Sequence, residues 1–344
     1  MKPFLPAWLL VFSCAIVPCF ADPLAVPALS ALPLPADIDA VISTGKDSKF
    51  KTLQEAVDAA PDHATKPYVI LLKPGRYRWQ QTLIPKSKRF IHLVGENPVT
   101  TTVSFHLNVY ETLKERRLEN LEGITLIAQG DDFRATNLTI ENTSGDHGQA
   151  LALRLDGDRC AVRNCRLLGW QDTLMANNGR HYFKDCYIEG RVDFIYGSGT
   201  AFFEGCELRS KNGGYVTAAS TPEENPFGYV FSHCKLTADP TPWDAEASNK
   251  KPPLAFLGRP WRPNASVIFL RCEMGSHIHP DGWNNWDKAE NEKTARYGEY
   301  QSTGPGARVN SRVKWSRQLT DEQAKAINVE KVFGGSDGWN PAKP

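Results

Sequence analysis

Short alternations of apolar and polar residues recur along the middle of the chain. Six four-residue units align on one another, with a small or apolar residue in the second position and an apolar residue in the fourth. They are Asn137-Leu138-Thr139-Ile140, Asn164-Cys165-Arg166-Leu167, Asp185-Cys186-Tyr187-Ile188, Gly205-Cys206-Glu207-Leu208, His233-Cys234-Lys235-Leu236 and Arg271-Cys272-Glu273-Met274. A period of two is typical of strands that bury one face. The units therefore predict a series of short β-strands.

The spacing of these units predicts how the strands are arranged. Successive units are 27, 21, 20, 28 and 38 residues apart. A period near 20 residues with loop insertions is typical of a stacked solenoid, in which each coil buries its apolar face against its neighbours. We therefore predict an all-β parallel β-helix. The alternative is a β-sandwich with accidental spacing, which leaves the aligned cysteines unexplained.

Helical periodicity appears only near the two ends of this region. Apolar residues recur at helical spacing between residues 50 and 60, with Thr52 as a candidate N-cap and Pro61 beyond the end. Near the other end, Thr320 and Gln323 have the spacing of a capping box for a short helix that reaches about Ile327. These segments predict short helices that cap the solenoid.

The first 21 residues have the features of a secretory signal peptide. Lys2 precedes a short apolar stretch that is interrupted by prolines and ends at Ala21. Lipidation of Cys14 or Cys19 is an alternative, although the residues before them do not form the usual processing motif. We expect a secreted protein, periplasmic or extracellular, with no membrane span. Residues 22–40 are predicted to form an extended lead-in with little fixed structure, and residues 41–340 a single domain.

Charge and cysteine content exclude several classes of protein. The chain has 40 basic and 39 acidic residues, and loss of the signal removes one lysine, so the mature net charge is zero and nothing favours nucleic-acid binding. The mature chain keeps six cysteines but no CxxC pair, which argues against a zinc site. Cys186 and Cys206 lie one coil apart. They form either a disulfide or part of a stack of buried thiols.

Two aspartates have equivalent places in the repeat. Asp172 follows Cys165 by seven residues, and Asp193 follows Cys186 by seven residues. Stacking in register places their carboxylates about 5 Å apart, the spacing of neighbouring strands. Two carboxylates this close cannot easily both ionise, so one is expected to keep its proton near neutral pH. The alternative is a pair of solvated turn residues, against which their apolar flanks argue.

Four sequence blocks around these residues resemble the signature blocks of pectin methylesterases, in the order of that family. They are GQALAL at 148–153, QDTL at 171–174, DFIYG at 193–197 and LGRPW at 257–261. The similarity extends through residues 123–145 and 299–309 and covers nearly the whole mature chain. The resemblance implies a right-handed single-stranded parallel β-helix. It also implies a secreted enzyme, for which we expect a bacterial source.

The resemblance implies a role for each residue of the site. Asp193 is expected to attack the methyl ester of a galacturonate unit, and Asp172 to act as the protonated partner. Gln149 and Gln171 are expected to stabilise the oxyanion, and Arg259 to hold Asp193 ionised. The resemblance also implies four contacts to the sugar. They are Gln149, Tyr196, Arg259 and Trp261, of which Tyr196 occupies a position that is commonly Phe in the family.

The implied reaction hydrolyses methylesterified homogalacturonan (pectin) to pectate and methanol through an acyl-enzyme, with no cofactor and no metal. The protein is expected to act as a monomer. Two classes of alternative stay open on the same fold. One is another galacturonan-active enzyme, a hydrolase or a calcium-dependent lyase. The other is a thioesterase-like or carbohydrate-binding relative in the periplasm.

Overall fold

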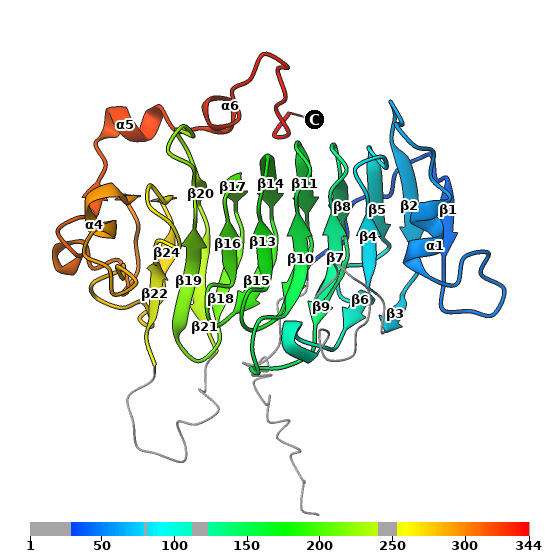
Figure 1. Ribbon diagram of the computed structural model, residues 1–344, viewed down its shortest axis with the longest axis horizontal. Helices are drawn as coiled ribbons and strands as arrows, with labels where there is room; N and C mark the ends of the chain where they lie inside the picture. Colours follow the sequence, from blue (N-terminus) through cyan, green and yellow to red (C-terminus); the bar gives the residue numbers. More distant parts are fainter. Residues whose placement is uncertain (1–28, 79–80, 112–122, 240–252, 344) are drawn as a thin grey trace, which may run out of the picture.

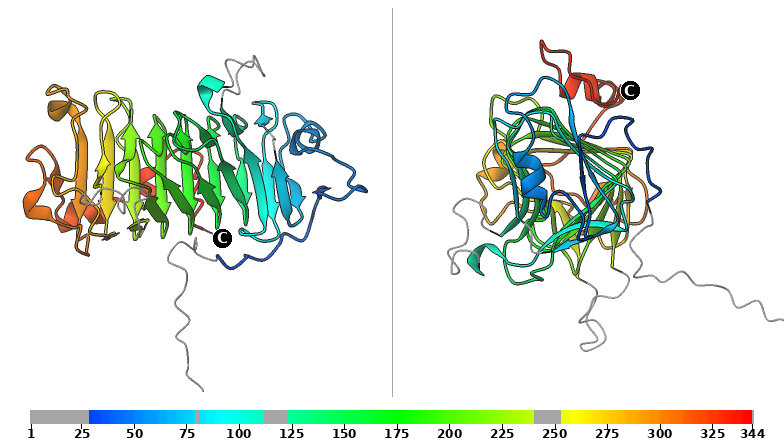
Figure 2. Two further views of the ribbon diagram at one scale, coloured as in Figure 1. Left: turned by 90° about the horizontal axis from the view of Figure 1, so that it is seen from below. Right: turned by 90° about the vertical axis from the view of Figure 1, so that its right-hand side faces the viewer.

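Successive coils of the chain stack into an elongated right-handed parallel β-helix (Figure 1). The computed structural model describes residues 29–78, 81–111, 123–239 and 253–343. Each complete coil contributes one strand to each of three parallel sheets, which surround a single interior (Figure 2, right). The predicted fold class is therefore confirmed. The proposed signal peptide lies outside the described residues.

Sheet 1 has eleven strands and carries the first strand of each coil. Its strands, in spatial order, are β1 (Ala40–Ile42), β2 (Tyr68–Leu72), β5 (Ile91–Gly95), β8 (Arg134–Thr136), β11 (Cys160–Arg163), β14 (Arg180–Lys184), β17 (Thr200–Glu204), β20 (Tyr229–Ser232), β23 (Ser266–Leu270), β25 (Arg296–Tyr300) and β26 (Arg317–Gln318).

Sheets 2 and 3 have eight and seven strands and complete each coil. The strands of sheet 2 are β3 (Gly75–Arg78), β6 (Thr101–Phe105), β9 (Thr139–Asn142), β12 (Arg166–Leu168), β15 (Tyr187–Gly190), β18 (Glu207–Ser210), β21 (Lys235–Ala238) and β24 (Glu273–Met274). The strands of sheet 3 are β4 (Thr82–Ile84), β7 (Ile124–Ala128), β10 (Leu151–Leu155), β13 (Leu174–Ala176), β16 (Ile195–Gly197), β19 (Gly214–Ala219) and β22 (Ala255–Gly258).

The interior is filled by columns of like side chains, because in-register pairing places equivalent residues of successive coils above one another. Phe183, Phe203, Phe231 and Phe269 form one such column. Their neighbouring ring centroids are 4.5, 4.4 and 4.6 Å apart, and each pair is stacked. All four side chains are fully buried. The alternation read from the sequence therefore corresponds to rows of inward-facing residues.

The six aligned units mark the turn from sheet 1 to sheet 2. The first residue of every unit has a left-handed backbone, with φ between 50° and 63°. Asparagine, aspartate and glycine adopt this conformation at low cost, and they occupy four of the six positions. Asn137 and Asn164 begin the first two units, and the side-chain amide of Asn164 donates to Oδ1 of Asn137 at 2.7 Å.

The same asparagines also bind the lead-in segment. The side-chain amide of Asn137 donates to the carbonyl of Leu32 at 2.8 Å, and its oxygen accepts from the N–H of Leu32 at 2.9 Å. The amide of Asn164 donates to the carbonyl of Ser30 at 2.8 Å. Residues 29–39 have no regular secondary structure, but these hydrogen bonds hold them along the coils. This part of the lead-in is therefore more fixed than the sequence analysis expected.

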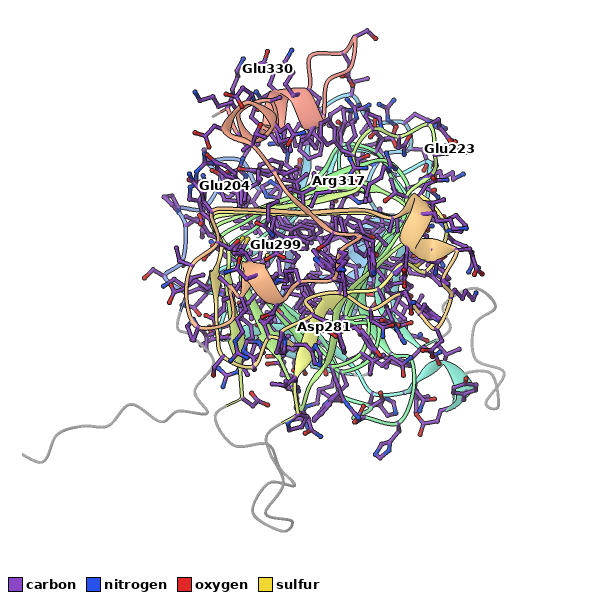
Figure 3. All side chains as sticks on the ribbon, turned by 90° about the vertical axis from the view of Figure 1, so that its left-hand side faces the viewer. Glu204, Glu223, Asp281, Glu299, Arg317 and Glu330 are labelled. Atoms are coloured by element: carbon purple, nitrogen blue, oxygen red, sulfur yellow. The ribbon has the colours of Figure 1, made fainter. Side chains whose placement is uncertain are left out.

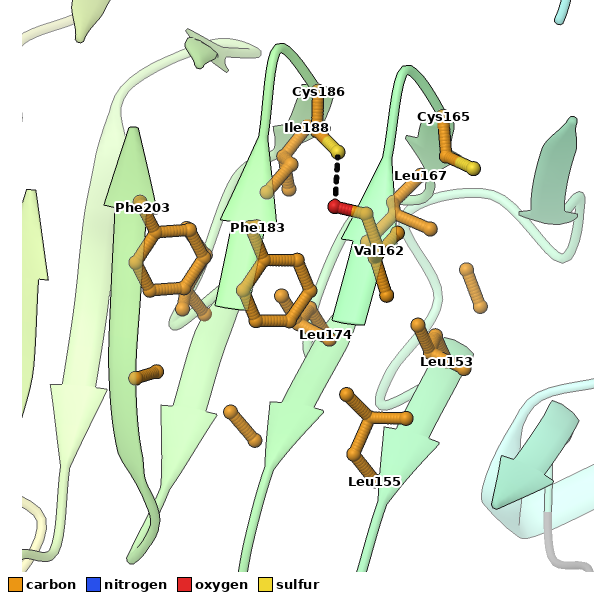
Figure 4. Packing of buried hydrophobic residues seen from close by; sticks show 14 of the residues in the cluster. Leu153, Leu155, Val162, Cys165, Leu167, Leu174, Phe183, Cys186, Ile188 and Phe203 are labelled. Carbon is orange, nitrogen blue, oxygen red and sulfur yellow. Dashed lines mark hydrogen bonds between the residues drawn. The ribbon is translucent and has the colours of Figure 1, made fainter. Parts of the chain in front are cut away.

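Of the two alternatives for Cys186 and Cys206, the disulfide is not observed, because all six cysteines of the mature chain are free and buried. In-register stacking makes the Cα–Cβ bonds of neighbouring coils run parallel, whereas a disulfide needs them to converge. Four of the thiols, those of Cys186, Cys206, Cys234 and Cys272, instead donate to a backbone carbonyl of the preceding coil at 3.4 to 3.6 Å. Figure 4 shows this hydrogen bond for Cys186 and Val162. The alternative of a column of buried thiols is the one observed.

Short helices cover the N-terminal end and one side of the β-helix. α1 (Leu53–Asp58) starts at the predicted N-cap, where Thr52 accepts from the N–H of Glu55, and it buries its apolar side in the core. α5 (Asp321–Lys325) starts with the predicted capping box of Thr320 and Gln323. α6 (Val329–Val332) follows, and both helices pack on the outer face of sheet 1 (Figure 1). Both predicted helices are confirmed.

The C-terminal end is closed by a buried ion pair. Arg312, which follows the 3₁₀ helix η1 (Val309–Ser311), donates to both carboxylate oxygens of Glu299 at 2.8 and 3.1 Å. Figure 3 looks onto this end and labels Glu299. The tail then runs back across sheet 1, where Arg180 makes a two-pronged pair with Asp337. Among the described residues, no helix has the length and apolar character needed to cross a membrane.

Thiol counting tests the column of free cysteines. The native mature chain, purified without reductant, should react very slowly with Ellman's reagent, because burial raises the pKa of thiols such as Cys186 and blocks access. In guanidinium chloride, six thiols per chain should react. A prereduced sample is the control. Four reactive thiols in the unreduced, unfolded sample would instead reveal a disulfide.

Candidate active site

Asp172 and Asp193 occupy the same place in successive coils, in the turn from sheet 2 to sheet 3. β13 and β16 pair with Leu174 opposite Ile195, so the two aspartates, each two residues earlier, correspond to one another. Both have left-handed backbones, with φ of 65° and 51°. Aspartate tolerates this conformation better than most residues. The structure thus brings the two carboxylates together, one coil apart.

The two carboxyl groups have different electrostatic environments. Burial and then the negative charge of Asp193 raise the pKa of Asp172 to about 8, although Arg259 and a hydrogen bond from the side chain of Tyr196 oppose this rise. Burial also raises the pKa of Asp193, and there the paired guanidinium of Arg259 opposes it. At neutral pH, Asp172 therefore keeps its proton while Asp193 is the carboxylate that ionises first.

Arg259 binds Asp193 with both prongs of its guanidinium. Nε donates to Oδ1 at 2.8 Å and Nη2 donates to Oδ2 at 2.7 Å. Arg259 directly follows β22, and its N–H donates to the carbonyl of Thr217 in the preceding coil at 3.0 Å. Gly258 is required there, since a Cβ would lie 2.0 Å from Oγ1 of Thr217. Tight packing of this loop thus fixes the guanidinium against one carboxylate only.

Two aromatic residues lie beside the carboxylates. Tyr196 stands on the outer face of sheet 3, in register with Met175, and its hydroxyl reaches Asp172 of the preceding coil. Trp261 is held by a hydrogen bond from its N–H to the carbonyl of Ala219 at 2.9 Å. The rings of Tyr196 and Trp261 meet edge to face, with centroids 5.8 Å apart. Both residues are partly exposed, so they border the pair of carboxylates with apolar surface.

The two predicted glutamines are neighbours across adjacent coils. Gln149 and Gln171 pair as an isolated parallel bridge, and the N–H of Ala150 donates to the carbonyl of Gln171 at 3.1 Å. Gln171 directly precedes Asp172. All seven residues predicted for the site therefore lie in or beside strands of sheet 3, with Arg259 and Trp261 just after the end of β22. Within the described residues, no cluster of His, Cys, Asp or Glu side chains could hold a metal ion.

Comparison with known families identifies this arrangement. The Pectinesterase family model matches residues 39–336. The chain belongs to the pectinesterase family. Pectinesterase 31 of Arabidopsis thaliana is 39% identical over 291 residues, which are 82% of this chain and 88% of that protein.

Solved pectinesterases share the fold. The chain is similar to carrot pectin methylesterase, with a TM-score of 0.79 and 30% identity over 89% of this chain and 96% of that chain. It is also similar to a pectin methylesterase solved in complex with hexasaccharide VII, with a TM-score of 0.72 and 30% identity over 90% of this chain and 100% of that one. Pectin methylesterases of plants and of bacteria such as Erwinia chrysanthemi are both similar to the chain, so the similarity does not decide between a plant and the expected bacterial source.

Two further residues of this pectinesterase site, Tyr215 and Trp286, are not evident from the sequence. The carbon of the Arg259 guanidinium lies 3.9 Å from the ring centroid of Tyr215 and 3.7 Å from that of Trp286. Tyr215 follows Asp193 by one coil in the same column, since β16 and β19 pair with Ile195 opposite Thr217. The seven-residue spacing from Cys206 points to Gly213, so the sequence repeat does not find Tyr215, because the turn in this coil is two residues longer. Trp286 comes from a segment outside the repeat, for which the pattern holds no signal.

Carboxyl titration by carbon NMR tests the difference between the two aspartates. In the wild-type protein, the Asp172 carboxyl should titrate near pH 8. Asp193→Asn should lower this value, because it removes a neighbouring negative charge. Tyr196→Phe should raise it, because the hydroxyl no longer donates to the carboxylate form. Shifts of the same sign in both variants would contradict the assignment.

Proposed function

We propose that this chain is a pectin methylesterase, which hydrolyses methyl esters of galacturonate in homogalacturonan to pectate and methanol. The observation that carries the proposal is the pair of neighbouring carboxylates, of which only Asp193 is bound by Arg259. One ionised and one protonated carboxyl group supply a nucleophile and a general acid in one site. Membership of the pectinesterase family and similarity to an oligosaccharide-bound pectin methylesterase support the same substrate class.

The first half of the reaction forms an acyl-enzyme. A carboxylate oxygen of Asp193 attacks the carbonyl carbon of the methyl ester, and the carbonyl oxygen becomes an oxyanion. Asp172 then donates its proton to the methoxy oxygen as the C–O bond breaks. Methanol leaves, and the galacturonate carbonyl is joined to Asp193 as an anhydride. Asp172 is now a carboxylate, which Tyr196 stabilises by its hydrogen bond.

The second half returns the enzyme to its starting state. The ionised Asp172 takes a proton from a water molecule, and the oxygen of that water attacks the anhydride carbonyl. The bond to Asp193 breaks, which releases the galacturonic acid group and restores the Asp193 carboxylate, and the released acid then loses its proton to solvent. Asp172 again holds its proton. The net change is one ester and one water converted to an acid and methanol, with no further reactant.

The remaining residues bind the oxyanion and the sugar. We assign the side-chain amides of Gln149 and Gln171 to the oxyanion, because amide N–H groups donate hydrogen bonds and a carboxylate cannot. Trp261 and Tyr196 form an apolar border on which sugar rings can pack. We also assign Arg259, which binds Asp193, and Gln149, which pairs with Gln171 beside Asp172, to contacts with the same galacturonate unit. These residues position the ester over Asp193.

We further propose that the protein acts as a monomer after export, without residues 1–21. The apolar stretch and the small residue at Ala21 support cleavage there. Intact-mass analysis of the exported protein should give a chain that begins at Asp22, and light scattering should give the mass of one chain. A retained leader or a lipid-modified cysteine in the mass spectrum would contradict this proposal.

Product analysis of aspartate variants tests the proposed reaction. Asp193→Asn and Asp172→Asn should each lower the rate of methanol release from highly methylated pectin by about 1,000-fold or more, because each removes half of the acyl transfer. The matched control is Asp185→Asn, which changes an exposed aspartate with the same left-handed backbone in another turn. That variant should keep the wild-type rate.

The same assay separates the esterase from other galacturonan-active enzymes. Methanol should appear without new reducing ends or unsaturated products, and EDTA should not change the rate. New reducing ends would indicate a hydrolase. Activity that disappears with EDTA, returns with calcium and yields unsaturated products would indicate a lyase. Either result would overturn the proposed function.

A further inference from the structure

A segment outside the coils is docked on both sides of Arg259. The N–H of Asn284 donates to the carbonyl of Gly258 at 3.1 Å, and the side-chain amide of Asn291 donates to the carbonyl of Pro260 at 3.4 Å. Gly258 and Pro260 are the two residues that flank Arg259 in the chain. Asn291 is the first residue of the short helix α4 (Asn291–Thr294). The segment 284–291 is thus fixed to the backbone that carries the guanidinium.

This segment is anchored in the core by Trp283. The side chain of Trp283 is 1% exposed, and its ring lies 4.3 Å from the ring of Tyr297 and 5.9 Å from that of Phe269. Trp283 also pairs with Gly258 as a parallel bridge. Its neighbour Trp286 is therefore presented by a rigid support. The position of Trp286 relative to Arg259 is set by packing and not by a free loop.

Trp286 holds a conformation that is unfavourable for a bulky residue. Its φ is 62°, in the left-handed region, and Asp287 follows with a φ of 54°. The N–H of Trp286 donates to Oδ1 of Asn284 at 2.8 Å, which stabilises the turn. Large residues with positive φ occur where the surrounding structure imposes them. Here the conformation directs the indole onto the guanidinium of Arg259.

Trp286 and Tyr215 lie against different sides of Arg259. Two ring centroids within 4 Å of the same guanidinium carbon cannot share one side, because the rings would overlap. Each contact has the geometry of a cation–π interaction, which stabilises a guanidinium most strongly where water is excluded. The remaining edge of the guanidinium faces Asp193. Rotation away from the carboxylate would break both ring contacts.

We propose that Trp286 and Tyr215 are positioning residues, which clamp Arg259 so that its two prongs stay on Asp193 and not on Asp172. The inference rests on the proposed function for its kinetic consequences, but the clamp itself is a property of the free protein. The charged group that faces both carboxyl groups is Arg259, and the hydroxyl of Tyr196 faces Asp172. The clamp thus maintains the charge difference between two otherwise equivalent carboxylates.

Substitutions at Trp286 test the clamp. Trp286→Leu should lower kcat/KM for methanol release by about tenfold, mainly through kcat, and move the acid limb of the pH profile to higher pH, because a mobile Arg259 stabilises ionised Asp193 less well. Trp286→Phe keeps an aromatic face and should recover most of the loss. Circular dichroism and thermal unfolding check that each variant is folded.

Two further variants show whether Trp286 acts through Arg259. Arg259→Lys keeps a charge but loses the planar fork, and it should also move the acid limb upwards. In the Arg259→Lys protein, Trp286→Leu should change kcat/KM by less than about twofold, since the guanidinium that Trp286 positions is absent. Trp261→Ala is the comparison for a sugar contact. It should raise KM and leave the acid limb in place.

Titration of the Asp193 carboxyl by carbon NMR tests the clamp without substrate. Trp286→Leu should raise the pKa of Asp193, and Trp286→Phe should leave it close to the wild-type value. An unmoved titration in folded Trp286→Leu would overturn the inference, even if the wild-type enzyme proves to act on another substrate. A higher KM with unchanged kcat, acid limb and titration would make Trp286 a sugar contact instead.

Discussion

In-register hydrogen bonding between successive coils is the constraint on which the rest of this protein depends. It places equivalent residues of neighbouring coils at one strand spacing, both inside and outside the β-helix. Inside, it produces the columns of phenylalanines and thiols. Outside, it brings Asp172 and Asp193 together although 20 residues separate them in the chain. The electrostatic coupling of the two carboxyl groups is therefore a direct consequence of the fold.

Stacking by itself makes the two aspartates equivalent, whereas acid–base chemistry requires them to differ. Arg259 removes the equivalence because it pairs with Asp193 alone, while Asp172 is bound by a neutral hydroxyl. The guanidinium can do this because the third member of the same column is Tyr215 and not another carboxylate. The chemical asymmetry of the site thus comes from Arg259, which lies outside the column and packs on its aromatic member.

Segments that lie outside the coils are held in fixed positions by contacts with the coils. The lead-in is held by an asparagine pair at the turn from sheet 1 to sheet 2, and the C-terminal tail is held by Arg180 on sheet 1. The segment that contains Trp286 is fixed beside Arg259 in the same manner, by hydrogen bonds to the backbone of a coil. A solenoid offers rows of backbone and side-chain groups along its surface, and these segments use them as docking sites.

The sequence by itself determined the solenoid, its capping helices and the pairing of Asp172 with Asp193. The solenoid and the aspartate pair follow from the recurring unit, because equivalent places in adjacent units stack in register, and the helices follow from helical spacing and capping residues. Only the tertiary structure decided that Cys186 and Cys206 stay free, since this depends on the directions of parallel Cα–Cβ bonds and not on spacing. It also decided which aromatic rings surround Arg259. Trp286 reaches the guanidinium from a segment without a repeat, through packing of Trp283 against the last coils, and such long-range contacts leave no periodic trace in the chain.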